Sequence, residues 1–151
     1  MAPARPVTAA APCALCEKHR GAGPLAGVAI YEDDLVLAYH APPEADGAYL
    51  GYVFVETRRH VAGLAARTDD EVVAEARLVT RVAAALTALG AEHVYSFVFD
   101  HVAHHHAHVV ARHPGAPREY WGWRVDEWPG APRADASALG EYCGRLAALL
   151  R

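Results

Sequence analysis

The sequence lacks the features that mark membrane-spanning, secreted or nucleic-acid-binding proteins. No apolar run approaches the roughly 20 residues that a membrane-spanning helix needs, and the Ala/Pro-rich start, Met1 to Pro12, has no apolar core of a secretory signal. The 14 basic and 18 acidic residues give a net charge of −4, which argues against broad electrostatic binding to nucleic acids or anionic membranes. Lys18 is the only lysine, and we attribute this scarcity to the base composition of the gene. We therefore expect a cytoplasmic protein with a disordered tail over residues 1–12.

Cysteine is also scarce, since the chain has only Cys13, Cys16 and Cys143. An odd number of cysteines without a secretory signal argues against a disulfide framework. Cys13 and Cys16 form a C-x-x-C pair between the Pro/Ala-rich start and a Gly/Pro-rich stretch, Gly21 to Pro24, which predicts a loop. The pair is interpreted as half of a zinc site, as two cysteines without a role, or as a redox pair, the last being the weakest interpretation.

The hydrophobic pattern predicts one domain that contains both strands and helices. The 151 residues are 53% hydrophobic and 21% charged, which is enough to bury a single core. Thr68 and Glu71 can form a capping box before a helical repeat that ends near Gly90. We expect strands at 28–31, 35–39, 49–57, 94–99 and 104–111, an aromatic loop at 118–135, and a C-terminal helix at 137–150, all within one domain over 13–151.

Histidine is abundant where lysine and cysteine are rare. The chain has 10 histidines, and several of them crowd the stretch 104–108. In an extended strand His104, His106 and His108 would share one face, about 6.8 Å apart. Crowded imidazoles suppress one another's protonation, and a neutral imidazole can act as a nucleophile. A plain metal-binding tract is the alternative, but it does not explain the alternation or the apolar residues that follow.

The stretch His104-His105-His106-Ala107-His108-Val109-Val110 resembles the histidine-triad (HIT) signature, His-φ-His-φ-His-φ-φ, where φ is apolar. Further motifs occur along the chain in the same order as in the family, and they resemble those of its zinc-containing bacterial members. They include the C-x-x-C pair, Tyr31-Glu32-Asp33-Asp34 followed by Leu37-Ala38-Tyr39, Gly51 to Val55 with Arg58-Arg59-His60, and the helix start at Thr68.

The resemblance implies a small α+β domain in which a five-stranded antiparallel sheet carries two main helices, usually as a homodimer. It also implies a nucleotidyl hydrolase or transferase that acts at the α-phosphorus of a phosphoramidate or dinucleoside polyphosphate. By motif position His106 is the nucleophile that forms a nucleotidyl-histidine, His108 contacts the phosphate or leaving group, and His104 supports the geometry. In zinc-bearing members the metal is structural, and its ligands map onto Cys13, Cys16, His60 and His104.

Four departures from the family pattern concern the substrate. Tyr52 replaces a family histidine, Ala41 replaces the aspartate that often binds ribose, and His105 replaces an apolar residue. A short link, 100–103, replaces the family's Gly-Gly-Gln-Ser stretch. We consider His101, Arg118, Tyr52 and Trp121 as candidate substrate-binding residues. Because nucleoside contacts are missing, a catalytically inactive nucleotide- or metal-binding protein is the alternative function.

Overall fold

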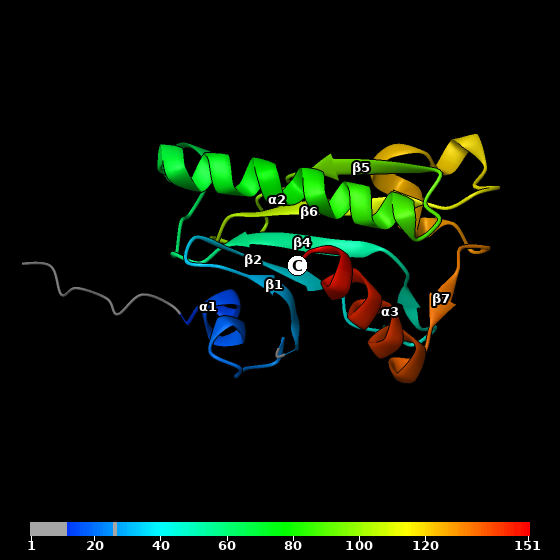
Figure 1. The fold of residues 1–151 in the computed structure, drawn as a ribbon, viewed down its shortest axis with the longest axis horizontal. Coiled ribbons are helices and arrows are strands. Elements are labelled where there is room, and N and C mark those ends of the chain that lie inside the picture. The colour runs from blue at the N-terminus through cyan, green and yellow to red at the C-terminus, as the bar shows by residue number, and fades with distance from the viewer. Residues whose placement is uncertain (1–11, 26) are drawn as a thin grey trace, which may run out of the picture.

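The structure, a computed structural model, describes residues 12–25 and 27–151. The tail expected at residues 1–12 therefore lies almost wholly outside the described residues. The main sheet is antiparallel with the strand order β1-β2-β4-β6-β5 (Figure 1). Its strands are β1 (Ala29–Glu32), β2 (Val36–His40), β4 (Tyr52–Thr57), β6 (His106–Arg112) and β5 (His93–Phe97), and a small second sheet pairs β3 (Ala48–Tyr49) with β7 (Arg133–Ala134). The expected α+β fold with a five-stranded antiparallel sheet is confirmed.

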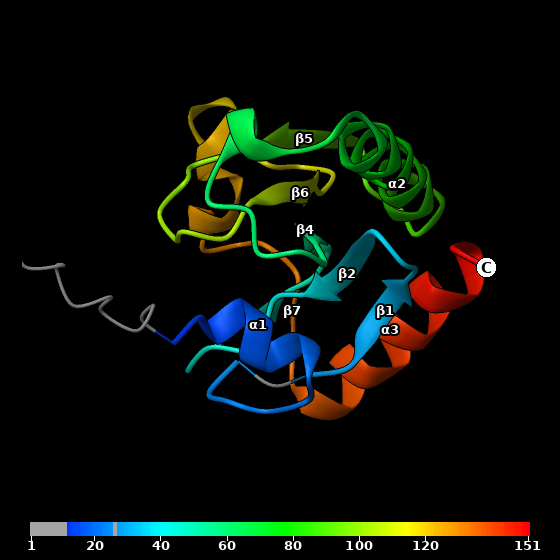
Figure 2. The ribbon, with the colours of Figure 1, turned by 90° about the vertical axis from the view of Figure 1, so that its left-hand side faces the viewer.

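Two main helices, α2 (Asp69–Ala88) and α3 (Ala136–Leu149), cover one face of this sheet (Figure 2). The capping box at the start of α2 is formed: Thr68 Oγ1 accepts from the Glu71 N–H at 3.2 Å, and Glu71 accepts from the Thr68 N–H at 2.8 Å. Leu89 rather than Gly90 caps the other end, and Gly90 follows it with a φ of +104° that favours glycine. The main core lies between these helices and the sheet and includes Val53, Val55, Leu78, Val82, Leu86, Val109, Leu146 and Leu150.

A third helix was missed. The sequence predicts a loop around the C-x-x-C pair, but α1 (Ala14–His19) begins there, with Cys13 as its N-cap and Cys16 in its first turn. The Cys13 sulfur accepts a hydrogen bond from the Cys16 N–H at 3.5 Å, in the manner of an N-cap side chain. Cysteine is not a common N-cap, and a helix of 6 residues is too short to show helical periodicity.

The other face of the sheet is only partly covered. In Figure 2, α1 lies over one part of this face and the segment around 118–127 over another. That segment, expected as a loop, forms two 3₁₀ turns (Arg118–Tyr120 and Gly122–Glu127). It packs through Val125 on Val110 and Tyr49. The row of side chains from Tyr39 across to His106 and His108 lies on this face.

Strand β6 begins at His106, two residues later than predicted. His104 and His105 precede the strand, and both side chains are fully buried. The prediction that His104 lies on a strand face with His106 and His108 is therefore wrong. His105 points to the helix-covered side, where its Nε2 lies 2.6 Å from Glu75 of α2. Glu75 also pairs with Arg67 at 2.9 Å, so an ionic network occupies a position that the family fills with an apolar side chain.

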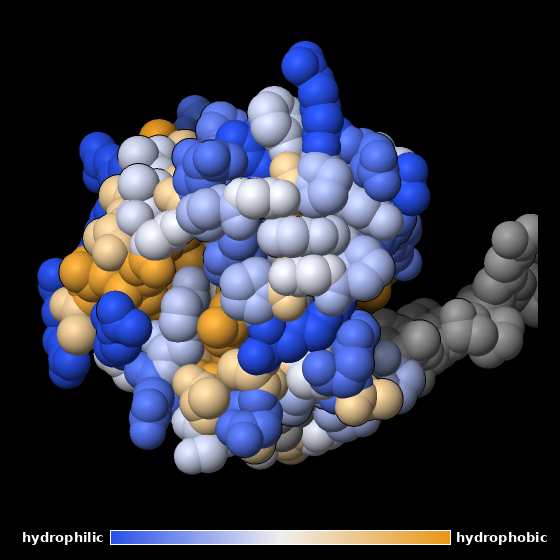
Figure 3. Space-filling view, turned by 90° about the vertical axis from the view of Figure 1, so that its right-hand side faces the viewer, coloured by the Kyte–Doolittle hydropathy of each residue, from blue (hydrophilic) through white to orange (hydrophobic). Residues whose placement is uncertain are grey.

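Among the described residues, no helix is both long and apolar enough to cross a bilayer. On the side of the molecule seen in Figure 3, hydrophilic residues cover most of the surface and apolar ones gather in a hollow.

Candidate functional site

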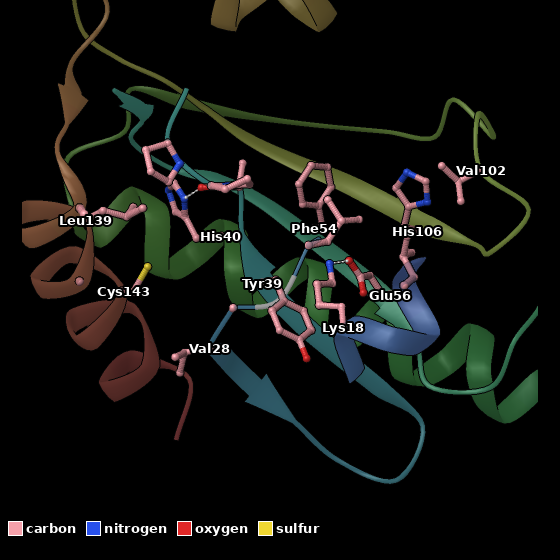
Figure 4. Close-up of a pocket in the computed structure, with 18 residues that line it drawn as sticks. Lys18, Val28, Tyr39, His40, Phe54, Glu56, Val102, His106, Leu139 and Cys143 are labelled. Atoms are coloured by element: carbon pink, nitrogen blue, oxygen red, sulfur yellow. Dashed lines mark hydrogen bonds and ion pairs between the residues drawn. The ribbon is translucent and has the colours of Figure 1, made fainter. Parts of the chain in front are cut away.

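His106 is held in the tautomer that a nucleophile needs. Its Nδ1 lies 2.9 Å from the backbone carbonyl oxygen of His104. Because a carbonyl only accepts, Nδ1 carries the proton and Nε2 keeps a free lone pair. The residue lines a cavity of about 490 Å³, and Figure 4 shows its ring at one end of that cavity. The arrangement leaves Nε2 as the ring atom that can attack an electrophile bound there.

His108 contacts a side-chain hydroxyl, whereas His106 contacts a backbone carbonyl. The Tyr52 hydroxyl lies 2.7 Å from His108 Nδ1. Burial raises the pKa of Tyr52 well above its usual value, so the hydroxyl stays protonated and is able to donate a hydrogen bond to Nδ1. Burial, followed by the neighbouring His106 and His101, lowers the pKa of His108 to about 4. When the hydroxyl donates, the hydrogen of a neutral His108 lies on Nε2.

The described residues around His108 provide no hydrogen-bond partner for its Nε2. The rings of Phe54, Phe97 and Phe99 lie 5.1–5.2 Å from the imidazole, which accounts for its desolvation. Nε2 is buried and has no hydrogen-bond partner among the described residues. A buried N–H without a partner is costly, and an oxygen of a bound ligand would satisfy it.

Four donors meet at the start of α1. Cys13, Cys16, His60 and His104 each offer one ligand atom, and these atoms lie within 4.8 Å of one another. Nδ1 of His104 is 3.4 Å from both sulfurs, and Nδ1 of His60 is 3.5 Å from the Cys16 sulfur. Tetrahedral zinc, with bonds of about 2.3 Å to sulfur and 2.0–2.1 Å to nitrogen, spaces such donors about 3.5 Å apart. The set therefore fits zinc in chemistry and in geometry.

His104 connects the metal-type cluster with the nucleophile. Its Nε2 lies 2.7 Å from the carbonyl oxygen of Thr57, which places the proton on Nε2 and leaves Nδ1 for a metal. Its own carbonyl holds His106 Nδ1. The two sites share His104 through different atoms: the ring serves one and the backbone serves the other.

The cavity beside His106 is largely apolar. Its walls come from α1, the end of β2, β4 and the first turns of α3, and they include Leu15, Leu25, Val28, Tyr39, Phe54, Leu139 and Cys143. Ala41 and Pro42 line the end of the cavity near His40, so residue 41 offers no carboxylate to a ribose. The size is that of a pocket for one small molecule.

One polar group in this cavity was missed by the sequence analysis. Lys18 of α1 forms an ion pair with Oε1 of Glu56 on β4 (Figure 4). His19 Nε2 lies 2.7 Å from Oε2 of the same carboxylate. Burial would raise the pKa of Glu56, but the hydrogen bonds from His19 and Lys18 hold it below its usual value. Glu56 is also the β-sheet partner of His106. Two signals in the sequence indicated this group: the single lysine, and a glutamate within an otherwise apolar strand.

The remaining predicted site residues are spread out. Tyr52 contacts His108 and lines a smaller cavity of about 240 Å³ next to the first. His101 is exposed and stacks on Phe99, whose ring is 5.1 Å away. Arg118 and Trp121 line neither cavity; the guanidinium of Arg118 lies 5.4 Å from the Trp121 ring, and the indole N–H donates to the Ala116 carbonyl.

Comparisons with known proteins identify the fold. No protein-family model and no curated protein matches the chain. Among solved structures, a Zn-bound histidine triad family protein from Mycobacterium smegmatis has a TM-score of 0.67 at 24% identity, covering 91% of this chain and 94% of that one. A hypothetical histidine triad nucleotide-binding protein from Sulfolobus tokodaii has a TM-score of 0.64 at 15% identity, with 91% of each chain covered. A Hit-like protein involved in cell-cycle regulation, from Bartonella henselae, has a TM-score of 0.61 at 22% identity, covering 81% and 85%.

These likenesses show that the chain has the histidine-triad fold, as its motifs predicted. Fold alone does not define an activity, because one scaffold can host different sites. The function is therefore argued from the residues of the site.

Proposed function

We propose that the protein is a histidine-triad nucleotidyl hydrolase or transferase that acts at the α-phosphorus of a nucleotide. The observation that carries the proposal is the orientation of His106: its Nδ1–H donates to the His104 carbonyl, and its ring borders a cavity large enough for one small molecule. The candidate substrates are phosphoramidates and dinucleoside polyphosphates. In either, the bond to be broken joins the α-phosphorus to a leaving group.

In the proposed reaction, Nε2 of His106 forms a bond to phosphorus while the bond to the leaving amine or phosphate breaks. The leaving group keeps the electron pair and takes a proton from solvent. Water, or another acceptor hydroxyl, then attacks phosphorus; the P–Nε2 bond breaks, and the proton of the attacking hydroxyl passes to solvent. Dividing the displacement into two steps is the usual advantage of a covalent intermediate.

His108 stabilises the charge on the phosphoryl oxygens in this scheme. Its Nε2–H is the unpartnered donor of the site, and a phosphoryl oxygen is the acceptor it requires. His108 does not supply a proton to the leaving group, because a neutral imidazole that gives up Nε2–H becomes an imidazolate. Tyr52 fixes this role by donating to Nδ1.

Replacing Tyr52 with phenylalanine should therefore lower kcat about 10- to 100-fold, the effect of losing one buried hydrogen bond in the transition state. KM should change little because the ring remains. Steady-state kinetics with an adenosine phosphoramidate measure both constants. The matched control is Tyr49→Phe, which removes a hydroxyl that donates to the Ala111 carbonyl instead of to a histidine. Equal losses of kcat in the two variants would contradict the role assigned to Tyr52.

We propose zinc as the structural metal, bound by Cys13, Cys16, His60 and His104. Two thiolates and two imidazoles complete a four-coordinate shell, which leaves no position for a substrate. The metal would tie α1 to the two chain segments that carry His60 and His104, and it takes no part in the phosphoryl chemistry. A zinc-bound histidine triad protein among the structural neighbours supports this assignment.

The covalent intermediate provides the direct test of the proposed function. The protein is mixed with an adenosine phosphoramidate, quenched within milliseconds to seconds, digested and examined by mass spectrometry. We expect a nucleotidyl mass on the peptide that contains His106, and none in the His106→Ala variant. An adduct on another residue, or turnover without any adduct, would count against the scheme.

Ala41 favours one second candidate, a protein that binds nucleotides without turning them over. The position that could hold a ribose through a carboxylate has none. The same quench experiment separates the candidates, because a binding protein would retain the phosphoramidate unchanged.

We also propose that the protein acts as a cytoplasmic homodimer. Strand β1 is covered by α3, whereas β5 forms the opposite edge of the sheet. The side chains of Phe99 and Trp123 are exposed near that edge. Unpaired edges invite pairing, so a second copy is expected along β5. Sedimentation should then give twice the mass of the chain.

A further inference from the structure

The single lysine of the chain lies inside the substrate cavity. Lys18 is 7% exposed, and it lines the cavity together with His106. Its Nζ lies 4.3 Å from the centre of the Tyr39 ring and 5.8 Å from that of Phe54. Figure 4 shows the ammonium between these rings and Glu56. A buried cation on the wall of a binding cavity selects what can be bound there.

The hydrogen bonds of the ion pair determine whether a ligand should bring a hydrogen-bond acceptor or a donor to this position. Each carboxylate oxygen of Glu56 already accepts one hydrogen bond, one from Lys18 and the other from His19. The Lys18 ammonium has three donors, and the described residues provide one acceptor, Glu56. The remaining N–H groups need acceptors from whatever fills the cavity. A donor on the ligand would have to compete with Lys18 and His19 for the Glu56 carboxylate, which is only 1% exposed.

The net charge of the ion pair further limits which ligand groups can lie beside Lys18. The ion pair of Lys18 and Glu56 is already neutral, so a ligand carboxylate would add a net negative charge to a desolvated cavity, at a high cost. A neutral carbonyl oxygen accepts from the ammonium without that cost. An amino group would place its own N–H donors against the cation. The neighbouring surfaces, the Tyr39 and Phe54 rings and Leu139, suit a flat and largely apolar ring.

From this geometry we infer that the cavity prefers nucleobases with an oxo group on the ring edge over bases with an amino group there, and that Lys18 makes the distinction. The inference rests on the proposed function, because it takes the ligand to be a nucleotide. It makes Lys18 a specificity-determining residue and gives Glu56 and His19 the task of holding it in place.

Matched nucleotide pairs test the preference. Inosine and adenosine 5′-monophosphates differ by an oxo against an amino group, as do uridine and cytidine 5′-monophosphates. Isothermal titration calorimetry measures their Kd values for the wild-type protein and for His106→Ala, which separates recognition from catalysis. We expect the oxo member of each pair to bind about tenfold more tightly, the value of one hydrogen bond to a charged group, and His106→Ala to keep this ratio.

Two variants assign the effect to Lys18. The double variant Lys18→Met with Glu56→Leu replaces the ion pair by apolar side chains of similar size, a change that buried pairs often tolerate. Lys18→Gln shortens the side chain by one atom, removes the charge and presents both a donor and an acceptor. In each variant the oxo-to-amino ratio should fall to about one, and thermal unfolding checks that the protein is folded.

Several results would overturn the inference. They are equal binding of the oxo and amino members by the wild-type protein, binding of none of the four nucleotides, or a ratio that persists in the folded Lys18 variants. The first result leaves the proposed function standing, because the His106 adduct is measured independently. Absence of the adduct with a clear oxo preference would instead leave recognition standing and remove catalysis.

Discussion

Replacing His106 with alanine should lower the rate of phosphoramidate cleavage by about 10³-fold or more, the usual loss when a covalent nucleophile is removed. No other imidazole in the site can take over. The His104 ring faces two cysteine sulfurs, and in the proposed arrangement Tyr52 donates to Nδ1 of His108, which places the His108 hydrogen on Nε2. The loss should appear in kcat, since His106 only borders the cavity and the apolar walls remain.

The control for this variant is His93→Ala. His93 is exposed on the edge strand β5, away from both cavities, and its ring meets that of Tyr95 edge-on at 4.9 Å. Because a second copy is proposed to pair along β5, sedimentation of this variant checks that its mass is that of the wild-type protein. Its removal changes the histidine content by the same amount and should leave kcat within about twofold. Retention of a tenth or more of the wild-type kcat by His106→Ala would exclude His106 as the nucleophile. A comparable loss in His93→Ala would show that the assay reports folding and not chemistry.

The parts of the fold that follow from local rules were predictable from the sequence. The capping box of Thr68 and Glu71 and the apolar repeat after it fix α2 within a residue or two. Alternating and β-branched residues locate most strands of the sheet in the same way. The strand predicted at 49–57 is instead divided at Gly51, whose φ is +82°, into β3 and β4 of two different sheets. The start of β6 was placed too early because His104 and His105 suit a strand by pattern. Their backbone instead follows a turn, in which the His104 N–H donates to the Val102 carbonyl at 2.7 Å.

Site residues that belong to sequence motifs were predictable, whereas contacts between residues far apart in the sequence were not. The metal-type cluster was assigned by motif, and the structure brings its four donors together from three separate segments. The ion pair of Lys18 and Glu56 was not foreseen, because it joins residues 38 positions apart on α1 and β4. The scarcity of lysine, taken as a matter of base composition, drew attention away from the one lysine that is buried in the cavity. A rare residue type can therefore be informative in its single occurrence.

Removal of the metal should produce the largest change in stability. The site joins α1, His60 and His104, and a helix as short as α1 does not hold together by itself. Free zinc at about 1,000 times its Kd stabilises the folded state by about 4 kcal/mol. Chelation should therefore lower Tm by roughly 10 °C. Turnover should also fall, because the His104 carbonyl that fixes the His106 tautomer loses its anchor.

Metal analysis together with thermal unfolding checks this expectation. The purified protein should contain one zinc per chain, and Cys16→Ser should lower Tm as chelation does and make it insensitive to a chelator. Cys143→Ser is the matched control, since this thiol lies on α3 outside the cluster and its loss should leave both the zinc content and the response to chelator unchanged. A metal-free protein whose Tm does not respond to a chelator would contradict the zinc assignment. Such a protein would have to fix His104 through the Thr57 carbonyl alone, and Cys16→Ser would then leave kcat near its wild-type value.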